Sequence, residues 1–153
     1  DFSKDPRGLM CPHAAHMRRL NPRDSQLTIM TDVHIHRIIR RSSTFGPKWR
    51  RELTASDDTG ERGIFFIFIS ARAYDTIEFF QQEWINRGNF IDLAEERDPV
   101  VGLQEPPGTF TMPQVPVRKR VDGVGTFNQL RGGEYLFMPS LGALRWIGGA
   151  GWR

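Results

Sequence analysis

The feature that most constrains the fold is an uninterrupted apolar run at 63–70, Gly-Ile-Phe-Phe-Ile-Phe-Ile-Ser. Its short length and its β-branched and aromatic residues favour a strand. Because side chains alternate along a strand, each face should carry three large apolar side chains. These are Ile64, Phe66 and Phe68 on one face, and Phe65, Ile67 and Ile69 on the other. The run therefore predicts a central strand that is covered on both sides.

A second strand and a helix are predicted on either side of this run. Residues 33–41 alternate between apolar and polar side chains, which predicts a strand with His34, His36 and Arg40 on one face. Residues 71–87 predict a helix, because large apolar side chains recur there at intervals of three and four. This stripe consists of Tyr74, Ile77, Phe80 and Trp84. Ser70 precedes the helix and is placed to cap its start.

The rest of the chain predicts shorter elements between loops. We expect a short helix over 14–20, a long loop over 98–131, a strand over 133–138 and a helix over 140–147. The order strand, strand, helix, strand makes up most of a ferredoxin-like β-α-β-β-α-β unit. The predicted class is α+β, of the dimeric α+β barrel type, with an antiparallel sheet and helices on one face. The first strand and first helix of the unit are missing.

Charge and cysteine content narrow the classes of function. The net charge is +3, and the arginines are spread along the chain among 18 acidic residues, so we expect no nucleic-acid partner. A lone cysteine, Cys11, excludes an internal disulfide framework and a cysteine-based zinc cluster. No run reaches the roughly 18 apolar residues of a membrane span. The first residue is not Met, so we expect a piece of a longer protein and leave its localisation open.

Two histidines, His34 and His36, lie two positions apart on one predicted strand, a spacing compatible with metal binding. The alternative, a pair of polar side chains on a half-solvated strand, is favoured because the sequence offers no carboxylate at a matching spacing. No serine or cysteine lies in a nucleophile elbow, and no phosphate-binding glycine motif is present. The sequence therefore gives no support to a hydrolase or to a nucleotide-binding protein.

The segment 11–23, Cys-Pro-His-Ala-Ala-His-Met-Arg-Arg-Leu-Asn-Pro-Arg, points to a different chemistry. It resembles the haem-ligand motif of the dye-decolorizing (DyP-type) peroxidase family, Cys-Pro-x-x-Ala-His-x-Arg-x-x-Asn-Pro-Arg. Four further blocks resemble segments of that family in the same order. They lie at 38–46, 62–66, 79–84 and 132–140. The resemblance thus extends over nearly the whole chain.

The resemblance implies a haem cofactor (heme b, iron protoporphyrin IX) with His16 as the axial ligand of the iron. The second ring nitrogen of such a histidine donates to an acceptor that orients the ring. In this family the acceptor is a carboxylate, and Asp98 is our candidate. The alternative for Asp98 is an aspartate that opens a turn before Pro99.

The resemblance also implies a site on the opposite, peroxide-binding side of the haem. Arg40 would be the catalytic arginine that stabilises the charge on the departing oxygen when peroxide is cleaved. Its alternative is a strand arginine paired with a surface acid. Ile64 and Phe66 match residues that narrow this pocket, and they can pack in the core at the same time. Several aromatic residues could relay electrons to the haem, although a core role is favoured for Trp84 because it continues the apolar stripe of the predicted helix. The candidates are Trp49, Tyr74, Trp84, Tyr135, Trp146 and Trp152.

The chain lacks two parts that the family has. The family's distal acid, in a Gly-x-x-Asp-Gly motif, is absent, because Lys119 stands where Asp122-Gly123 would need a glycine. The family's first ferredoxin-like domain is absent too. We therefore expect residues 1–153 to form the C-terminal haem-ligating domain of a haem-dependent peroxidase, which turns over poorly on its own. Its partners would be hydrogen peroxide and an organic reductant such as a dye, oxidised in one-electron steps.

Two alternatives to a peroxidase stay open. The first is a non-catalytic haem-binding remnant, and the second is a cofactor-free basic interaction domain. A haem absorption band that depends on His16 would separate the peroxidase and the haem-binding remnant from the cofactor-free domain. Dye bleaching that depends on Arg40 would separate a peroxidase from a remnant. A homo-oligomer is compatible with all three.

Overall fold

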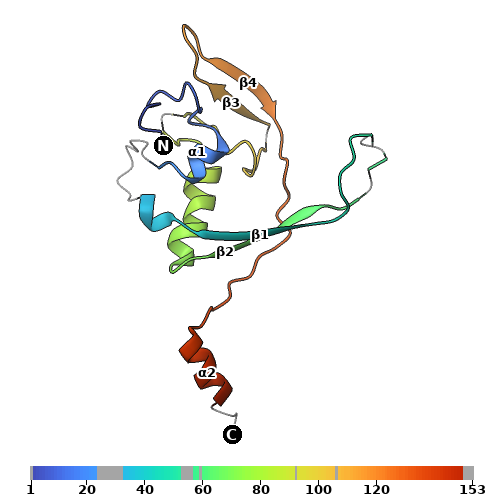
Figure 1. Ribbon diagram of the computed structural model, residues 1–153. Coiled ribbons are helices and arrows are strands. Elements are labelled where there is room, and N and C mark those ends of the chain that lie inside the picture. The colour runs from blue at the N-terminus through green and yellow to red at the C-terminus, as the bar shows by residue number, and fades with distance from the viewer. Residues whose placement is uncertain are drawn as a thin grey trace.

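Two antiparallel hairpins, with a helical segment between them, are the main elements in the part of the chain that the computed structural model describes (Figure 1). The described residues are 2–23, 33–52, 57–58, 60–91, 93–105 and 107–149. In chain order the elements are helix α1 (His16–Leu20), 3-10 helix η1 (Val33–His36), strands β1 (Ile39–Phe45) and β2 (Gly63–Ile69), π-helices η2 (Tyr74–Glu78) and η3 (Phe80–Asn86), strands β3 (Gly108–Met112) and β4 (Lys119–Val124), and helix α2 (Leu141–Gly149). The class is α+β, as predicted.

The β1–β2 hairpin confirms the strand predicted from the apolar run. Its register pairs Ile39 with Ile69 and Phe45 with Gly63. The expected burial on both sides is wrong, since Ile64 on one face is 57% exposed and Phe65 on the other is 62% exposed. A strand is buried on both faces only where further layers pack onto it. Among the described residues, β2 pairs with β1 alone.

The strand predicted over 33–41 begins later than expected. Residues 33–36 form η1, and β1 starts only at Ile39. The cause lies in His36, whose ring stacks on Phe79 at 4.1 Å between centroids and meets Trp84 edge-on. This packing turns the segment onto the helices and removes His34 and His36 from the predicted strand face.

The helix predicted over 71–87 is present from Tyr74 to Asn86, with π-type rather than α-type turns. Its buried positions are therefore spaced by four and five residues, at Thr76, Phe80 and Ile85, with Trp84 beside them. Tyr74, which the α-helical spacing placed in the apolar stripe, is 70% exposed. Ser70 does not cap the helix through the expected position, although its hydroxyl accepts a hydrogen bond from the Arg72 amide.

The long loop predicted over 98–131 contains a hairpin that the prolines obscured. Strands β3 and β4 pair antiparallel from Gly108–Val124 to Met112–Lys119. The buried carboxylate of Glu96 accepts hydrogen bonds from the amide and the hydroxyl of Thr111. Glu96 thereby holds the hairpin against the loop that follows the π-helices.

In the C-terminal part, the predicted helix is present and the predicted strand is not. The last helix is present as α2, and the Ser140 hydroxyl accepts a hydrogen bond from the Ala143 amide at its start. The strand expected over 133–138 is not formed, since these described residues are exposed and belong to neither sheet. Figure 1 shows this segment running away from the rest of the chain toward α2.

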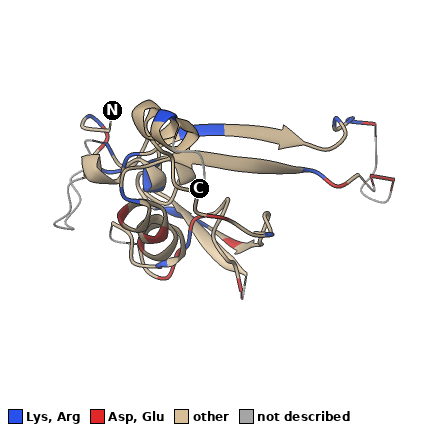
Figure 2. Ribbon diagram, turned by 90° about the horizontal axis from the view of Figure 1, so that it is seen from below, with Lys and Arg blue, Asp and Glu red and all other residues tan. Residues whose placement is uncertain are grey.

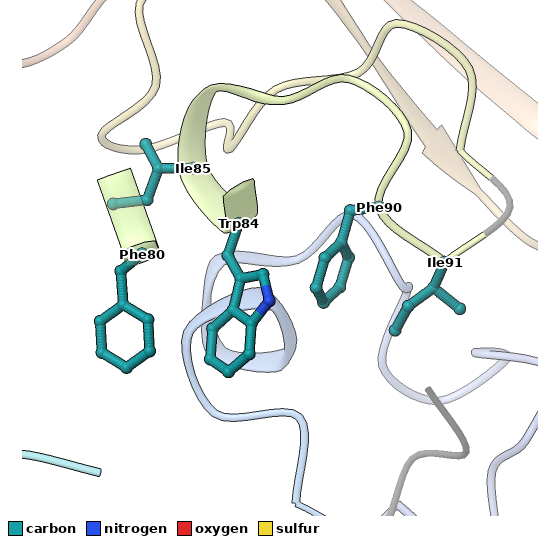
Figure 3. Close-up of a cluster of buried hydrophobic side chains, with 5 residues drawn as sticks. All are labelled: Phe80, Trp84, Ile85, Phe90 and Ile91. Atoms are coloured by element: carbon teal, nitrogen blue, oxygen red, sulfur yellow. The ribbon is translucent and has the colours of Figure 1, made fainter. Parts of the chain in front are cut away.

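The core is a small aromatic cluster between η3 and the turn that follows it. Its buried members are Phe80, Trp84, Ile85, Phe90 and Ile91. Figure 3 shows the Trp84 indole between the rings of Phe80 and Phe90, and the centroids of Phe80 and Trp84 are 4.8 Å apart. Helix α1 contacts η3, so the cluster supports the helix that carries His16.

Charged residues of both signs are interspersed along the described chain, as Figure 2 shows. No helix in the described ranges is both long and apolar enough to cross a membrane.

Candidate functional site

Helix α1 is held at its start by a buried aspartate in the preceding turn. Asp5 accepts hydrogen bonds from the amides of Leu9, Met10 and Cys11 at 2.7, 3.2 and 2.9 Å. Arg18, buried in α1, donates to the Asp5 carboxylate at 3.2 Å and to its carbonyl at 2.8 Å. These contacts wrap residues 5–11 around one carboxylate and fix the helix that carries His16.

The central contact of the site joins His16 to Asp98. His16 Nδ1 lies 2.9 Å from Asp98 Oδ2 and 3.1 Å from Oδ1. The Asp98 side chain is 0% exposed, whereas that of His16 is 33% exposed. Because an ionised carboxylate only accepts hydrogen bonds, this contact places the ring proton on Nδ1. Nε2 then keeps its lone pair, and among the described residues it has no hydrogen-bond partner.

Asp98 is held in place by both its side chain and its backbone. Oδ1 accepts hydrogen bonds from the amides of Val100 and Val101 at 2.9 and 3.0 Å, which makes the turn expected of an aspartate before proline. Burial by itself would raise the pKa of Asp98. The hydrogen bond from His16 and the two amides outweigh burial, so the pKa of this carboxyl lies below its ordinary value. The carboxylate is thus ionised beside His16.

Arg19 is a buried residue near the pair that the sequence reasoning missed. Its guanidinium donates to the carbonyls of Trp84, Glu96 and Arg87. Burial lowers the pKa of Arg19 to about 10, against the opposing effect of the Asp98 and Glu96 charges. The sequence suggested only that basic residues favour the end of a helix. No signal in the sequence distinguished Arg19 from its neighbour Arg18, and both are buried in the structure.

Arg40, Ile64 and Phe66, the residues expected on the peroxide side, lie on one face of the β1–β2 hairpin. The register pairs Arg40 with Phe68, Ser42 with Phe66 and Thr44 with Ile64. Arg40 lies over the Phe66 ring at 5.3 Å, and its Nε donates to the Ser42 hydroxyl at 2.9 Å. Among the described residues, no hydrogen bond, ion pair or ring contact joins this group to His16 or Asp98.

The other candidate residues stay apart from the site. His36 is buried in aromatic packing and His34 is exposed. In the ranges that the structure covers, no three side chains of His, Cys, Asp or Glu are grouped to hold a metal ion. Trp84 belongs to the core; Trp49, Tyr74, Tyr135 and Trp146 are exposed, and Trp152 lies outside the described residues. An open hollow beside η2 is lined by Ile35, Tyr74 and Glu78, among others, and by none of His16, Asp98, Arg40, Ile64 and Phe66.

Comparisons with known proteins find relatives that match most of this chain. A dye-decolorizing peroxidase of Mycetinis scorodonius is 29% identical over 96% of the chain. One of Mycena epipterygia is 31% identical over 92%, and the multifunctional dye peroxidase DyP2 of Amycolatopsis is 31% identical over 95%. The chain spans between 30% and 34% of the length of these relatives. No family model matches the chain.

Two solved structures share the fold of this chain. DyP2 from Amycolatopsis aligns over 84% of the chain with a TM-score of 0.62 and 23% identity. A DyP-type peroxidase from Anabaena aligns over 80% with a TM-score of 0.63 and 22% identity. The chain covers 30% and 26% of these two structures.

Proposed function

Because the chain is related to the DyP-type peroxidase family over most of its length, we propose that it is the C-terminal, haem-ligating part of a haem-dependent peroxidase. The substrates would be hydrogen peroxide and an organic reductant, such as a dye. One observation carries the proposal above the others. A buried carboxylate, Asp98, holds one nitrogen of a partly exposed imidazole, His16, at 2.9 Å and leaves the other nitrogen available.

The residues present fit a haem better than a bare metal ion. A bare ion needs several protein ligands, and no such cluster occurs among the described residues. A haem iron needs only an axial ligand from the protein, because the porphyrin supplies the other nitrogens. His16, whose Nδ1 contacts Asp98 and whose Nε2 has no hydrogen-bond partner among the described residues, would supply such a ligand.

The chain's own residues would divide the work between two sides of the haem. His16 would hold the cofactor, and Asp98 would fix its ring and tautomer. When bound, the haem supplies the redox chemistry of peroxide cleavage and of one-electron oxidation. Arg40 would stabilise the negative charge on the departing oxygen. Ile64 and Phe66, on the same face as Arg40, would limit access to small molecules.

The test uses the gene product that contains this chain, at its natural length and loaded with haem. Peroxide-driven bleaching of a dye is compared between Arg40→Leu and the matched control Arg41→Leu. Arg41 neighbours Arg40 on β1 and is exposed like it, but its side chain lies on the opposite face of the hairpin. We expect bleaching to fall at least about a hundredfold for Arg40→Leu, the usual cost of losing one charge-stabilising donor, and to change little for Arg41→Leu.

Three results would separate the readings. Bleaching that depends on Arg40 but not on Arg41 supports the peroxidase. Haem that is bound through His16 without any bleaching overturns the catalytic proposal in favour of a haem-binding module. A protein that binds no haem overturns both and leaves a cofactor-free interaction domain.

A further inference from the structure

We propose that Arg19 is a positioning residue for the His16–Asp98 pair. Arg19 lies three positions after His16 on α1, about one helical turn away. It is 0% exposed, which is unusual for an arginine without a special partner. The significance of the pair for haem rests on the proposed function, but the geometric claim about the pair can be tested without haem.

The guanidinium of Arg19 binds one helix end through two of its N–H groups. Nε donates to the Trp84 carbonyl at 2.5 Å, and Nη2 donates to the Arg87 carbonyl at 2.9 Å. These carbonyls lie at the C-terminal end of η3, where the helix runs out of amide donors of its own. A cation is also favoured there by the helix dipole. Arg19 therefore holds α1, and His16 with it, against this helix end.

The loop that carries Asp98 is held at the same place. Nη1 of Arg19 donates to the Glu96 carbonyl at 2.9 Å, two residues before Asp98. The Asp98 amide donates to the Ile85 carbonyl at 2.8 Å, which belongs to the same last turn of η3. Both members of the pair are thus held by backbone carbonyls at the C-terminal end of η3. Displacing the guanidinium would remove a link between α1 and the 96–98 loop other than the His16–Asp98 contact itself.

The arrangement requires the shape of arginine as well as its charge. A planar guanidinium presents several N–H groups in fixed directions, whereas a lysine ammonium is a compact charge on a flexible stem. The guanidinium also lies over the Phe90 ring at 4.9 Å, so one face is closed by the core. A lysine at position 19 would keep the charge and could not reach three carbonyls in these directions.

The experiment reads the His16 tautomer in the full chain without haem. Long-range proton–nitrogen NMR spectra at about pH 8, where an imidazole is ordinarily neutral, distinguish protonation at Nδ1 from protonation at Nε2. The variants are Arg19→Lys and the matched control Arg18→Lys. Arg18 is also buried in α1, and it donates to Asp5 and Cys11 in the segment before the helix.

We expect His16 of the wild type to be protonated at Nδ1 and Arg19→Lys to lose that preference, while Arg18→Lys retains it. The Trp84 indole signal reports in each variant that the core is folded. A folded Arg19→Lys chain with an unchanged His16 tautomer overturns the proposal. Loss of the preference in Arg18→Lys to the same degree also overturns it, because the effect would then be general loosening of α1.

A second measurement needs no variant and covers the case in which Arg19→Lys does not fold. In the wild type, the Arg19 Nε–H and the Asp98 amide N–H, which donates to the Ile85 carbonyl, should give the same free energy of opening once each exchange rate is corrected for the intrinsic rate of its group, because one opening exposes both. An Asp98 amide that opens at a much lower free energy than Arg19 contradicts the proposal. If the tautomer result holds and haem still fails to bind at His16, the positioning role of Arg19 stands and only the proposed function fails.

Discussion

The His16 imidazole and the Asp98 carboxylate are 82 positions apart in the sequence and meet at 2.9 Å. The contact orients the ring, since Asp98 is buried and is itself fixed by the amides of Val100 and Val101. Whatever occupies Nε2 therefore meets an imidazole whose direction and tautomer are set beforehand. Three predictions concern this contact, and a fourth concerns the core that supports helix α1.

Replacing Asp98 by Asn should weaken haem binding about 10- to 100-fold, the usual effect of changing the outer partner of a metal-bound histidine. An amide retains an acceptor for the ring but loses the charge. The measurement is a spectrophotometric haem titration of the full chain. Asp122→Asn is the control, because Asp122 lies exposed on β4. Equal affinities for the two variants would contradict the role assigned to Asp98.

Acid should destabilise the fold through the same carboxylate. The pKa of Asp98 is lowered in the folded chain, so its contribution to the free energy of unfolding is fully present above the ordinary value of 3.8. That contribution is lost as the pH falls through the lowered folded pKa. Asp5, whose pKa is also lowered, adds a loss of the same sign. Urea unfolding followed from neutral to acidic pH should show a smaller acid loss in Asp98→Asn, and an identical loss would refute this.

Gly102→Ala should disturb the site from the loop side. A Cβ at this position would lie 2.5 Å from the Asp98 carbonyl oxygen and 3.0 Å from its amide nitrogen, so the backbone that carries the carboxylate would have to move. We expect a loss of about 1–3 kcal/mol in the free energy of unfolding, together with weaker haem binding. Gly125→Ala, with no atom within 4 Å of the added Cβ, serves as the control. If both substitutions are neutral, the close packing around Asp98 is not required.

The core should tolerate removal of the Trp84 ring nitrogen better than removal of the ring. Trp84 Nε1 is buried without a hydrogen-bond partner among the described residues. Trp84→Phe should therefore cost less than about 1.5 kcal/mol, in the range of conservative core exchanges. Trp84→Ala should cost about 3–5 kcal/mol because it leaves a cavity beside Phe80 and Phe90. Comparable losses in chemical denaturation of both variants would mean that Nε1 has a partner.

The local elements were largely predictable, and the long-range ones were not. The strand at 63–69, the helix around α1 and the final helix follow from residue type and periodicity. The start of β1 was misplaced because His36 packs on Phe79, a contact that alternation along a strand cannot reveal. The β3–β4 hairpin was hidden by the prolines around it, although Thr109 to Thr111 favour a strand.

The residues of the candidate site also differ in how far the sequence could predict them. The resemblance to the haem-ligand motif predicted a role for His16, and the carboxylate acceptor of that family suggested Asp98; the structure brings the two side chains together at 2.9 Å. Arg19 was not identified, because its role depends on the carbonyls of Trp84, Arg87 and Glu96, which only the folded chain brings together. Sequence reasoning thus finds groups that bear chemistry more readily than groups that hold them.

The most direct test of the central claim is the electronic spectrum of ferric haem bound to the full chain, with His16→Ala compared against His34→Ala. His34 is an exposed imidazole outside the site. Coordination by His16 predicts that His16→Ala shifts the Soret band to the position of haem without an axial imidazole and removes the axial-imidazole nitrogen couplings from the EPR spectrum of the same sample, whereas His34→Ala changes neither. The same spectrum and affinity in His16→Ala as in the wild type would contradict the claim.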